Sequence, residues 1–205
     1  MRARRAGADL SDPLLEGLSR YLDLLIRWNR TINLTGLSSL DEAVDRLLVE
    51  PVIAARELPA GAIRILDVGS GAGSPGFPLK LAQPAAHLTL VESKVRKAAF
   101  LREVVRELRL TEVDVETARY EQLLSRADLT ESADVVSVRA VRADARLLRG
   151  IQGFVRPSGR LWLFKTGDGD AGSSVHLPFE VERSVKLVES LRSSLVIVRR
   201  LPVPS

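Results

Sequence analysis

The spacing of apolar residues along the chain changes at about residue 60. Before that point apolar side chains recur every three or four positions, which predicts amphipathic helices over residues 12–30 and about 39–55. Ser39-Leu-Asp-Glu42 has the composition of a capping box and opens the second helix. Because both helices precede any strand pattern, we expect residues 1–58 to form an N-terminal helical cap.

Beyond residue 60, short apolar runs alternate with helical segments. The apolar runs predict strands at 63–68, 88–92, 113–117, 134–138 and 160–165. The segments between them predict helices near 76–83, 94–109, 120–127 and 142–155. We expect Ser93 to cap the second of these helices. Alternation at this spacing predicts a doubly wound, Rossmann-like α/β sheet that is mostly parallel.

Two further β-rich segments, 179–188 and 192–201, follow a polar, glycine-containing stretch. No helix is predicted between them, so we expect an antiparallel hairpin at the edge of the sheet. The chain shows no internal repeat. Residues 59–205 are therefore expected to form one α/β domain that makes a single compact unit with the cap.

The most informative segment follows the first predicted strand. That strand reaches an acid, Asp67, and is followed by glycines at positions 69, 71, 73 and 76. Glycine accepts positive φ and lets a ligand approach the backbone closely. A tight turn explains one or two of these glycines, so we interpret the loop as a site for a nucleotide-like ligand.

Three ligand classes compete for this loop. A P-loop requires Gly-Lys-Ser/Thr, which is absent. The dinucleotide pattern G-x-G-x-x-G matches Gly71 to Gly76, but the match begins beyond the strand end and contains Pro75. The S-adenosylmethionine pattern acid-x-G-x-G-x-G fits Asp67 to Gly73 in register. Glu92 ends the next predicted strand, where a carboxylate can accept hydrogen bonds from ribose hydroxyls. This holds for a dinucleotide site and for an S-adenosylmethionine site. We therefore favour S-adenosylmethionine.

Composition excludes several other chemistries. The chain has no cysteine, so it has no disulfide, thiolate nucleophile or iron–sulfur cluster, and its two histidines, His87 and His176, lie on no motif. We expect no metal site. The net charge of +4 permits a polyanionic partner. No apolar run approaches the roughly 20 residues of a membrane span, and no apolar segment follows the basic N-terminus. We expect a cytoplasmic monomer without membrane contact.

Three motifs resemble the bacterial RsmG (GidB) family. They are Trp28-Asn-Arg-Thr-Ile-Asn-Leu-Thr35, Asp67-Val-Gly-Ser-Gly-Ala-Gly-Ser-Pro-Gly-Phe-Pro78 and Ser93-Lys-Val-Arg-Lys-Ala-Ala-Phe-Leu101. The resemblance runs from about residue 12 to 165. It implies a class I methyltransferase fold and methylation of guanine N7 in 16S ribosomal RNA, presented as free RNA, small subunit or assembly intermediate.

Guanine N7 carries a lone pair and no proton, so its attack on a methyl group needs no general base. Two absences agree with such an acceptor. Cytosine-C5 methylation normally uses a cysteine nucleophile, and the chain has none. Methylation of exocyclic amino groups typically uses an N/D-P-P-Y/F segment after the fourth strand, where this chain reads Ser137-Val-Arg139.

The resemblance also implies cofactor contacts in the loop, after the third strand and at the end of the fourth. With the acids above, the predicted cofactor set is Asp67, Gly69, Gly71, Gly73, Ser74, Glu92, Tyr120, Glu121 and Arg139. We expect Arg139 to position the reactants rather than to transfer a proton. Because RNA binding needs positive charge near the strand ends, the candidate RNA contacts are Arg96, Lys97, Arg139, Arg142 and Lys165.

The chain departs from the family pattern in its second helix. The family usually has Arg-His-x-x-Asp-Ser where this chain has Arg46-Leu-Leu-Val-Glu50-Pro51. We therefore expect the cap to be ordered over the crevice in a different way. Two alternatives stay open: a methyltransferase for a small molecule or protein with the cap as a lid, and a nucleotide- or RNA-binding module without catalysis.

Overall fold

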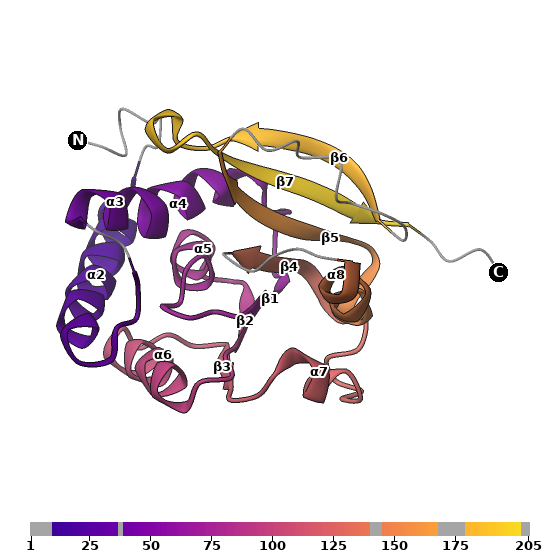
Figure 1. Ribbon diagram of the computed structural model, residues 1–205, viewed down its shortest axis with the longest axis horizontal. Helices are drawn as coiled ribbons and strands as arrows, with labels where there is room; N and C mark the ends of the chain where they lie inside the picture. The colour runs from indigo at the N-terminus through magenta and orange to yellow at the C-terminus, as the bar shows by residue number, and fades with distance from the viewer. Residues whose placement is uncertain (1–9, 37–38, 140–144, 168–178, 202–205) are drawn as a thin grey trace.

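Seven strands form one sheet in the computed structural model, which describes residues 10–36, 39–139, 145–167 and 179–201 (Figure 1). They are β1 (Arg64–Val68), β2 (His87–Val91), β3 (Val113–Glu116), β4 (Ala133–Arg139), β5 (Val155–Thr166), β6 (Phe179–Lys186) and β7 (Ser193–Arg200). The strand order is β3-β2-β1-β4-β5-β7-β6. Neighbouring strands among the first five are parallel, and β7 is antiparallel to β5 and β6. The predicted sheet and its edge hairpin are confirmed.

The helices lie on both faces of the sheet (Figure 1). They are α2 (Asp12–Ile32), α3 (Leu40–Val44), α4 (Glu50–Ala54), α5 (Gly76–Ala82), α6 (Val95–Glu107), α7 (Tyr120–Leu123) and α8 (Ala145–Ile151). Helices α2 to α6 cover one face, and α7 and α8 lie on the other. No helix of the described segments has both the length and the apolar character needed to cross a membrane.

Three helices differ from their predicted extents. The helix predicted over 39–55 is interrupted between α3 and α4 by a π-helical turn, Asp45–Val49. The one predicted over 120–127 has only four residues, and the last ends at Ile151, before a 3₁₀ turn. Val155 already belongs to β5, because it pairs with Ala133 at a bulge in the parallel ladder. Side-chain spacing does not record this long-range pairing.

The central strands are buried along most of their length and mostly apolar because helices cover both faces of the sheet. In β1, Ile65 belongs to the hydrophobic cluster under α2, α4, α5 and α6, and its neighbour Leu66 belongs to the cluster under α8. The alternation follows from the two-residue period of a strand. A helix layer therefore packs on each face, and the strand ends remain for a ligand.

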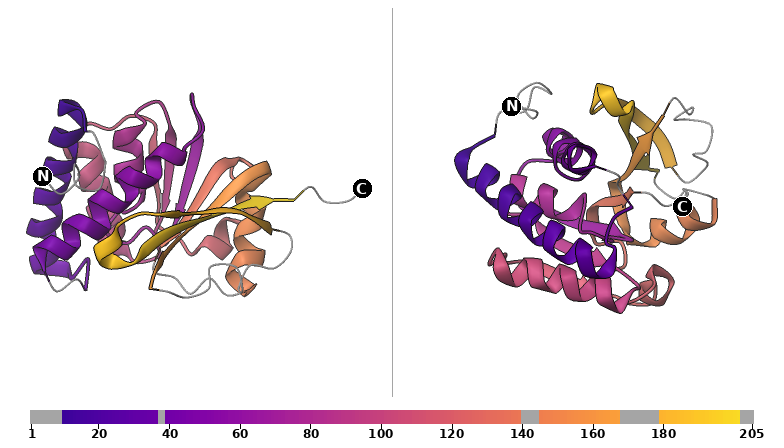
Figure 2. Two further views of the ribbon diagram at one scale, coloured as in Figure 1. Left: turned by 90° about the horizontal axis from the view of Figure 1, so that it is seen from above. Right: turned by 60° about the vertical axis from the view of Figure 1, so that its left-hand side comes forward.

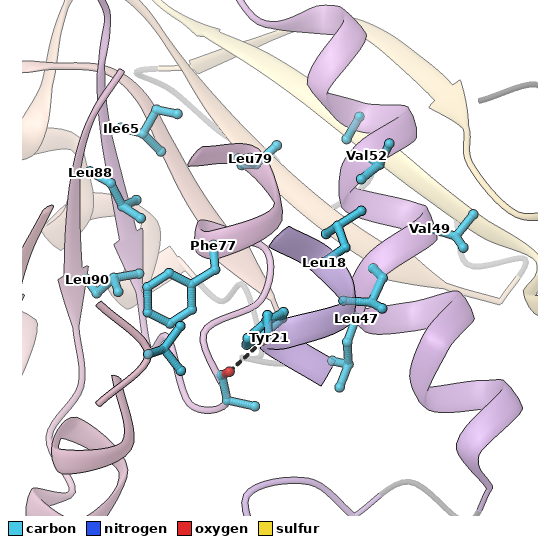
Figure 3. Packing of buried hydrophobic residues seen from close by; sticks show 14 of the residues in the cluster. Leu18, Tyr21, Leu47, Val49, Val52, Ile65, Phe77, Leu79, Leu88 and Leu90 are labelled. Carbon is cyan, nitrogen blue, oxygen red and sulfur yellow. Dashed lines mark hydrogen bonds between the residues drawn. The ribbon is translucent and has the colours of Figure 1, made fainter. Parts of the chain in front are cut away.

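The N-terminal helices dock on the outer side of α5 and α6 (Figure 2). Leu18 and Tyr21 of α2 belong to the same hydrophobic cluster as Phe77 of α5 and Leu88 of β2 (Figure 3). The Tyr21 and Phe77 rings meet edge to face with centroids 5.5 Å apart. The cap and the sheet thus share one continuous core.

Candidate functional site

The carboxyl ends of β1 and β4 meet where the strand order reverses direction, since the chain runs from β1 outwards to β3 and returns to β4 on the other side. Open α/β sheets bind ligands in the crevice outside such a point. A cavity of about 630 Å³ lies here. Its lining consists of Leu34, Thr35, Gly36, Arg46, Leu47, Glu50, Gly69, Ser70, Gly71, Ala72, Ser74, Glu92, Lys94, Lys97, Arg139, Phe164, Lys165 and Thr166.

The glycines of the loop divide into two groups. Gly69 and Gly71 have φ of 74° and 55° and line the cavity. Gly73 does not line it: a Cβ there would lie 2.3 Å from the ring of Phe77. A Cβ on Gly76 would lie 2.5 Å from a leucine of β2. Two of the glycines therefore serve close packing of α5 on the loop and the sheet, and two offer backbone to a ligand.

Asp67 lies behind the loop rather than in the cavity lining. It is 1% exposed, and its Oδ1 accepts a hydrogen bond from the Ser137 hydroxyl at 2.7 Å. Burial raises the pKa of this carboxyl to about 6, against the hydrogen bond from Ser137 and the charge of Arg139. Its described contacts connect β1 to β4, so its geometry is that of a support for the loop.

Glu92 lines the cavity and is bonded to the backbone on two sides. Its Oε2 accepts the amide of Gly71 at 2.9 Å, and its Oε1 accepts the amide of Lys94 at 2.7 Å. Helix α6 begins after Lys94, which is its N-cap residue and has no side-chain cap bond, so the prediction that Ser93 caps this helix is wrong. A carboxylate has about four lone-pair sites, which leaves acceptor capacity for a ligand hydroxyl.

Arg139, at the end of β4, is enclosed rather than exposed. Its Nη1 donates to Glu50 Oε2 and to the Arg46 carbonyl, each at 2.7 Å, and its guanidinium lies 4.4 Å from the Phe164 ring centre. Burial lowers the pKa of this guanidinium, and the charge of Glu50 opposes that shift. Its Nε and Nη2 are buried with no hydrogen-bond partner among the described residues.

Two hydroxyl groups complete the contact between the cap and the glycine loop. Ser74 donates to the Leu47 carbonyl at 2.9 Å. Tyr21 donates to the Ala72 carbonyl at 2.6 Å (Figure 3). Burial raises the pKa of Tyr21, so its hydroxyl keeps its proton and remains a donor. The cap therefore fixes the loop at two points and β4 at a third, through Arg139.

Tyr120 and Glu121 lie at a neighbouring cavity of about 140 Å³, which shares Gly69 with the larger one. The Tyr120 ring also packs on α8, where a Cβ on Gly150 would lie 2.6 Å from it. These two residues thus adjoin the predicted site at the ends of β1 and β2.

The predicted RNA contacts are distributed unevenly. Lys97 and Lys165 line the cavity, and Lys97 Nζ donates to the Leu34 carbonyl at 3.2 Å. Arg96 is exposed on α6 and does not line the cavity. Arg142 lies outside the described residues. The lining nevertheless carries five lysine or arginine side chains against two glutamates, which favours an anionic partner.

Several lining residues were missed by sequence reasoning. Gly36 and Phe164 belong to none of the three family motifs, and Leu34, Thr35 and Lys94 belong to such motifs but carry no separate signal for a site. Arg46 and Glu50 were recognised only as part of a segment that departs from the family pattern. Their role depends on contact with Arg139, which lies 89 positions from Glu50 in the sequence. Among the described residues no group of three or more metal-ligating side chains occurs.

Comparisons with known proteins agree on one family. A sequence model described as "GidB: rRNA small subunit methyltransferase G" matches residues 14–186. A ribosomal RNA small subunit methyltransferase G of Halorhodospira halophila is 43% identical over 157 residues, covering 77% of this chain and 72% of the relative. Its counterpart in Roseiflexus castenholzii is 35% identical over 209 residues, covering 97% and 89%.

Solved structures support the fold at lower identity. A SAM-dependent methyltransferase from Aquifex aeolicus has a TM-score of 0.58 with 15% identity, over 83% of this chain and 97% of that one. A mutant of MtNAS in complex with S-adenosylmethionine has a TM-score of 0.55 with 19% identity, over 98% of this chain and 71% of that one. The sheet is thus of the Rossmann-like type found in methyltransferases.

Proposed function

The chain belongs to the rRNA small subunit methyltransferase G (GidB) family, and on that premise we propose that it transfers a methyl group from S-adenosylmethionine to N7 of a guanine in 16S ribosomal RNA. The observation that carries the proposal is the cavity at the switch point. Residues of the glycine loop, Glu92, Lys97 and Lys165 all line it. A nucleoside-like cofactor and an anionic acceptor can therefore meet there.

The residues present fit this cofactor. Glu92 has free acceptor capacity for ribose hydroxyls, and the positive-φ backbone at Gly69 and Gly71 allows close approach. Tyr120 and Glu121 adjoin Gly69, where the adenine would lie. When bound, S-adenosylmethionine supplies an electrophilic methyl group on a sulfonium.

The lining also fits an acceptor that needs no deprotonation. Among the described residues the lining contains no histidine, the chain has no cysteine, and both carboxylates of this lining already accept hydrogen bonds from the protein. We propose that Arg139 contributes by positioning, because alignment of the two reactants by itself lowers the barrier substantially. A ring nitrogen with an exposed lone pair is the acceptor that such a site suits best.

We propose that the substrate is 16S rRNA, as free RNA, in the small subunit or in an assembly intermediate, and that the reaction takes place in the cytoplasm. Lys97 and Lys165 would contact its phosphates, as structured RNA is recognised largely through shape and backbone. We also propose that the protein acts as a monomer. Arg96, exposed beside Lys97, would extend the same basic surface.

The test is methylation of small subunits that lack the modification, with radiolabelled cofactor. Label should enter 16S rRNA, and borohydride followed by aniline should cleave the RNA at the labelled N7-methylguanosine. Label without that cleavage would contradict N7 as the acceptor. Cofactor binding without transfer to any RNA would favour a small-molecule or protein methyltransferase, and no binding at millimolar cofactor would favour a non-catalytic module.

A pair of glycine variants tests the cofactor site itself. In Gly71→Ala the new Cβ has space, with its nearest neighbour at 3.7 Å, so the positive φ should cost only about 1–2 kcal/mol of stability. The methyl group lies in the cavity lining and should weaken cofactor binding about tenfold or more, or about 1.4 kcal/mol. Calorimetric titration and thermal unfolding measure the two effects.

Gly73→Ala is the matched control for Gly71→Ala. Its Cβ would meet Phe77 at 2.3 Å and not the cavity, so we expect a larger fall in melting temperature than for Gly71→Ala. Cofactor affinity equal to that of the wild type in Gly71→Ala would show that Gly71 does not approach the ligand.

A further inference from the structure

The interruption in the second cap helix lies against the cavity. In the π-helical turn Asp45–Val49, the amide of Glu50 bonds to the carbonyl of Asp45. An α-helix would pair that amide with the Arg46 carbonyl. The next residue, Pro51, has no amide to pair with the Leu47 carbonyl. Two consecutive carbonyls are thereby released from their α-helical partners.

Both released carbonyls accept hydrogen bonds from residues of the site. The Arg46 carbonyl accepts Arg139 Nη1 at 2.7 Å, and the Leu47 carbonyl accepts the hydroxyl of Ser74 at 2.9 Å. Buried carbonyls need partners, and here the partners come from β4 and from the glycine loop. The same broken helix therefore holds two separate parts of the predicted cofactor site.

Glu50 adds a charge to this arrangement. Its side chain is 3% exposed and its Oε2 lies 2.7 Å from Arg139 Nη1, while the Arg139 side chain is 14% exposed. Without that carboxylate, Arg139 would lose its direct ionic partner in an enclosed position, which is strongly unfavourable. Glu50 and the Arg46 carbonyl therefore fix one end of the guanidinium, and Phe164 fixes its face.

We propose that Glu50 is a positioning residue which, together with the carbonyls released by the π-turn and Pro51, holds Arg139 and Ser74 in the geometry that cofactor binding and methyl transfer require. Arg139 Nε and Nη2 and Glu50 Oε1 have no hydrogen-bond partner among the described residues. These atoms are buried, and both residues line the cavity. The inference rests on the proposed function, since it assigns Glu50 and Pro51 to the same site.

A double-mutant cycle tests whether Glu50 acts through Arg139. Glu50→Gln should weaken S-adenosylmethionine binding about tenfold, or about 1.4 kcal/mol, and slow single-turnover methyl transfer to small subunits by up to about 100-fold. In an Arg139→Gln background the same change should alter neither quantity further. The proposal would be overturned if Glu50→Gln lowered cofactor affinity and the transfer rate by the same factors in both backgrounds. It would also be overturned if Glu50→Gln affected neither quantity.

Glu131→Gln is the matched control for this cycle. It breaks an ion pair with Arg200 that is also partly buried but lies outside the cavity lining. We expect a lower melting temperature with unchanged cofactor affinity. A loss of affinity equal to that of Glu50→Gln would mean that any broken ion pair disturbs the site, and would also overturn the assignment.

Pro51→Ala tests the released carbonyl directly. The new amide can bond to the Leu47 carbonyl in α-helical register and compete with Ser74. Stability should stay equal or rise, while cofactor affinity falls by about 2- to 10-fold, the value of one net hydrogen bond. Pro13→Ala, in the first turn of α2, should leave affinity unchanged. Unchanged affinity in Pro51→Ala would remove the proline from the proposal.

Cofactor affinity is measured without RNA, so the two proposals can fail separately. A wild-type protein that binds S-adenosylmethionine but methylates no RNA would refute the proposed function. The affinity cycle would still decide the role of Glu50. A wild-type protein that methylates 16S rRNA with additive effects at Glu50 and Arg139 would refute only the positioning role, and one that binds no S-adenosylmethionine would refute both.

Discussion

Among single residues, Asp67 and Glu92 are both carboxylates beside the glycine loop, but their surroundings differ. Glu92 accepts two backbone amides at the cavity wall. Asp67 is enclosed behind the loop with Ser137 as its side-chain partner, and burial raises its pKa to about 6. Charge on Asp67 is therefore costly to the fold, and its ionisation should be visible in the pH dependence of stability.

Asp67→Asn should change stability in a pH-dependent way. The folded pKa of about 6 exceeds the ordinary 3.8, so the folded protein binds more protons than the unfolded chain between these values. The stability that wild-type Asp67 contributes is full below pH 4 and is lost as the pH rises through 6. Relative to Asp67→Asn, the wild type should lose on the order of 3 kcal/mol over this range. Urea unfolding from pH 4 to 8 measures it.

Glu182→Gln serves as a control of opposite sign. A hydrogen bond from Arg160 lowers the pKa of Glu182, so its contribution should be present above the unfolded pKa and lost as the pH falls. A difference between wild type and Asp67→Asn that does not vary with pH would show that Asp67 ionises normally.

At the scale of elements, the cap helices hold the ligand loop as well as covering the core. Helix α2 reaches the loop through Tyr21, and the broken helix α3–α4 reaches it through the Leu47 carbonyl. The first contact ends on Ala72, between Gly71 and Gly73, and the second ends on Ser74, which follows Gly73. The conformation that the ligand meets is therefore set partly by elements that precede the first strand.

Tyr21→Phe should separate this role from simple packing. The ring is retained, but the buried Ala72 carbonyl loses its hydroxyl donor at 2.6 Å, which should cost about 1–3 kcal/mol of unfolding free energy. Because Ala72 lines the cavity, cofactor affinity should fall as well. Urea unfolding and calorimetric titration measure the two effects.

Ser132→Ala is the comparison for Tyr21→Phe. It also removes a hydroxyl that donates to a backbone carbonyl, that of Leu129 at 3.0 Å, away from the cavity lining. We expect lower stability with unchanged cofactor affinity. If Tyr21→Phe behaves in the same way, α2 stabilises the fold without influencing the ligand loop.

For the whole molecule, we propose that residues 1–58 and 59–205 unfold as one unit. Trp162 of β5 belongs to the hydrophobic cluster that includes residues of α2. Trp28 of α2 packs against the same cluster, and the centres of the Trp28 and Phe100 rings are 5.7 Å apart. A core that crosses the boundary between cap and sheet favours a single cooperative transition.

The two tryptophans, which are the only ones in the chain, make this proposal measurable. Trp162→Phe leaves Trp28 to report on the cap, and Trp28→Phe leaves Trp162 to report on the sheet. In each variant the urea midpoint from fluorescence should equal the midpoint from far-ultraviolet circular dichroism. Loss of the Trp28 signal at lower urea than the dichroism signal would show that the cap is a separate domain.

Much of this architecture is already determined by the sequence. The alternation of strands and helices and the edge hairpin follow from side-chain periodicity. The ligand loop after β1 follows from the need for glycine at positive φ. These features depend on residues close together in the chain. The position of Glu92 directly after β2 could be predicted for the same reason. Family membership could be inferred for the same reason, since its motifs are contiguous.

Only the tertiary structure decided how the site is assembled. Glu50 meets Arg139 across 89 positions, and Ser74 meets Leu47 across 27. Gly71 and Gly73 look alike in the sequence, yet one faces the cavity and the other Phe77. Such roles depend on which surfaces pack together, and packing is a property of the whole fold. The sequence predicted where the glycine loop lies, and the packing of α5 and of the cap against that loop determined which of its residues line the cavity.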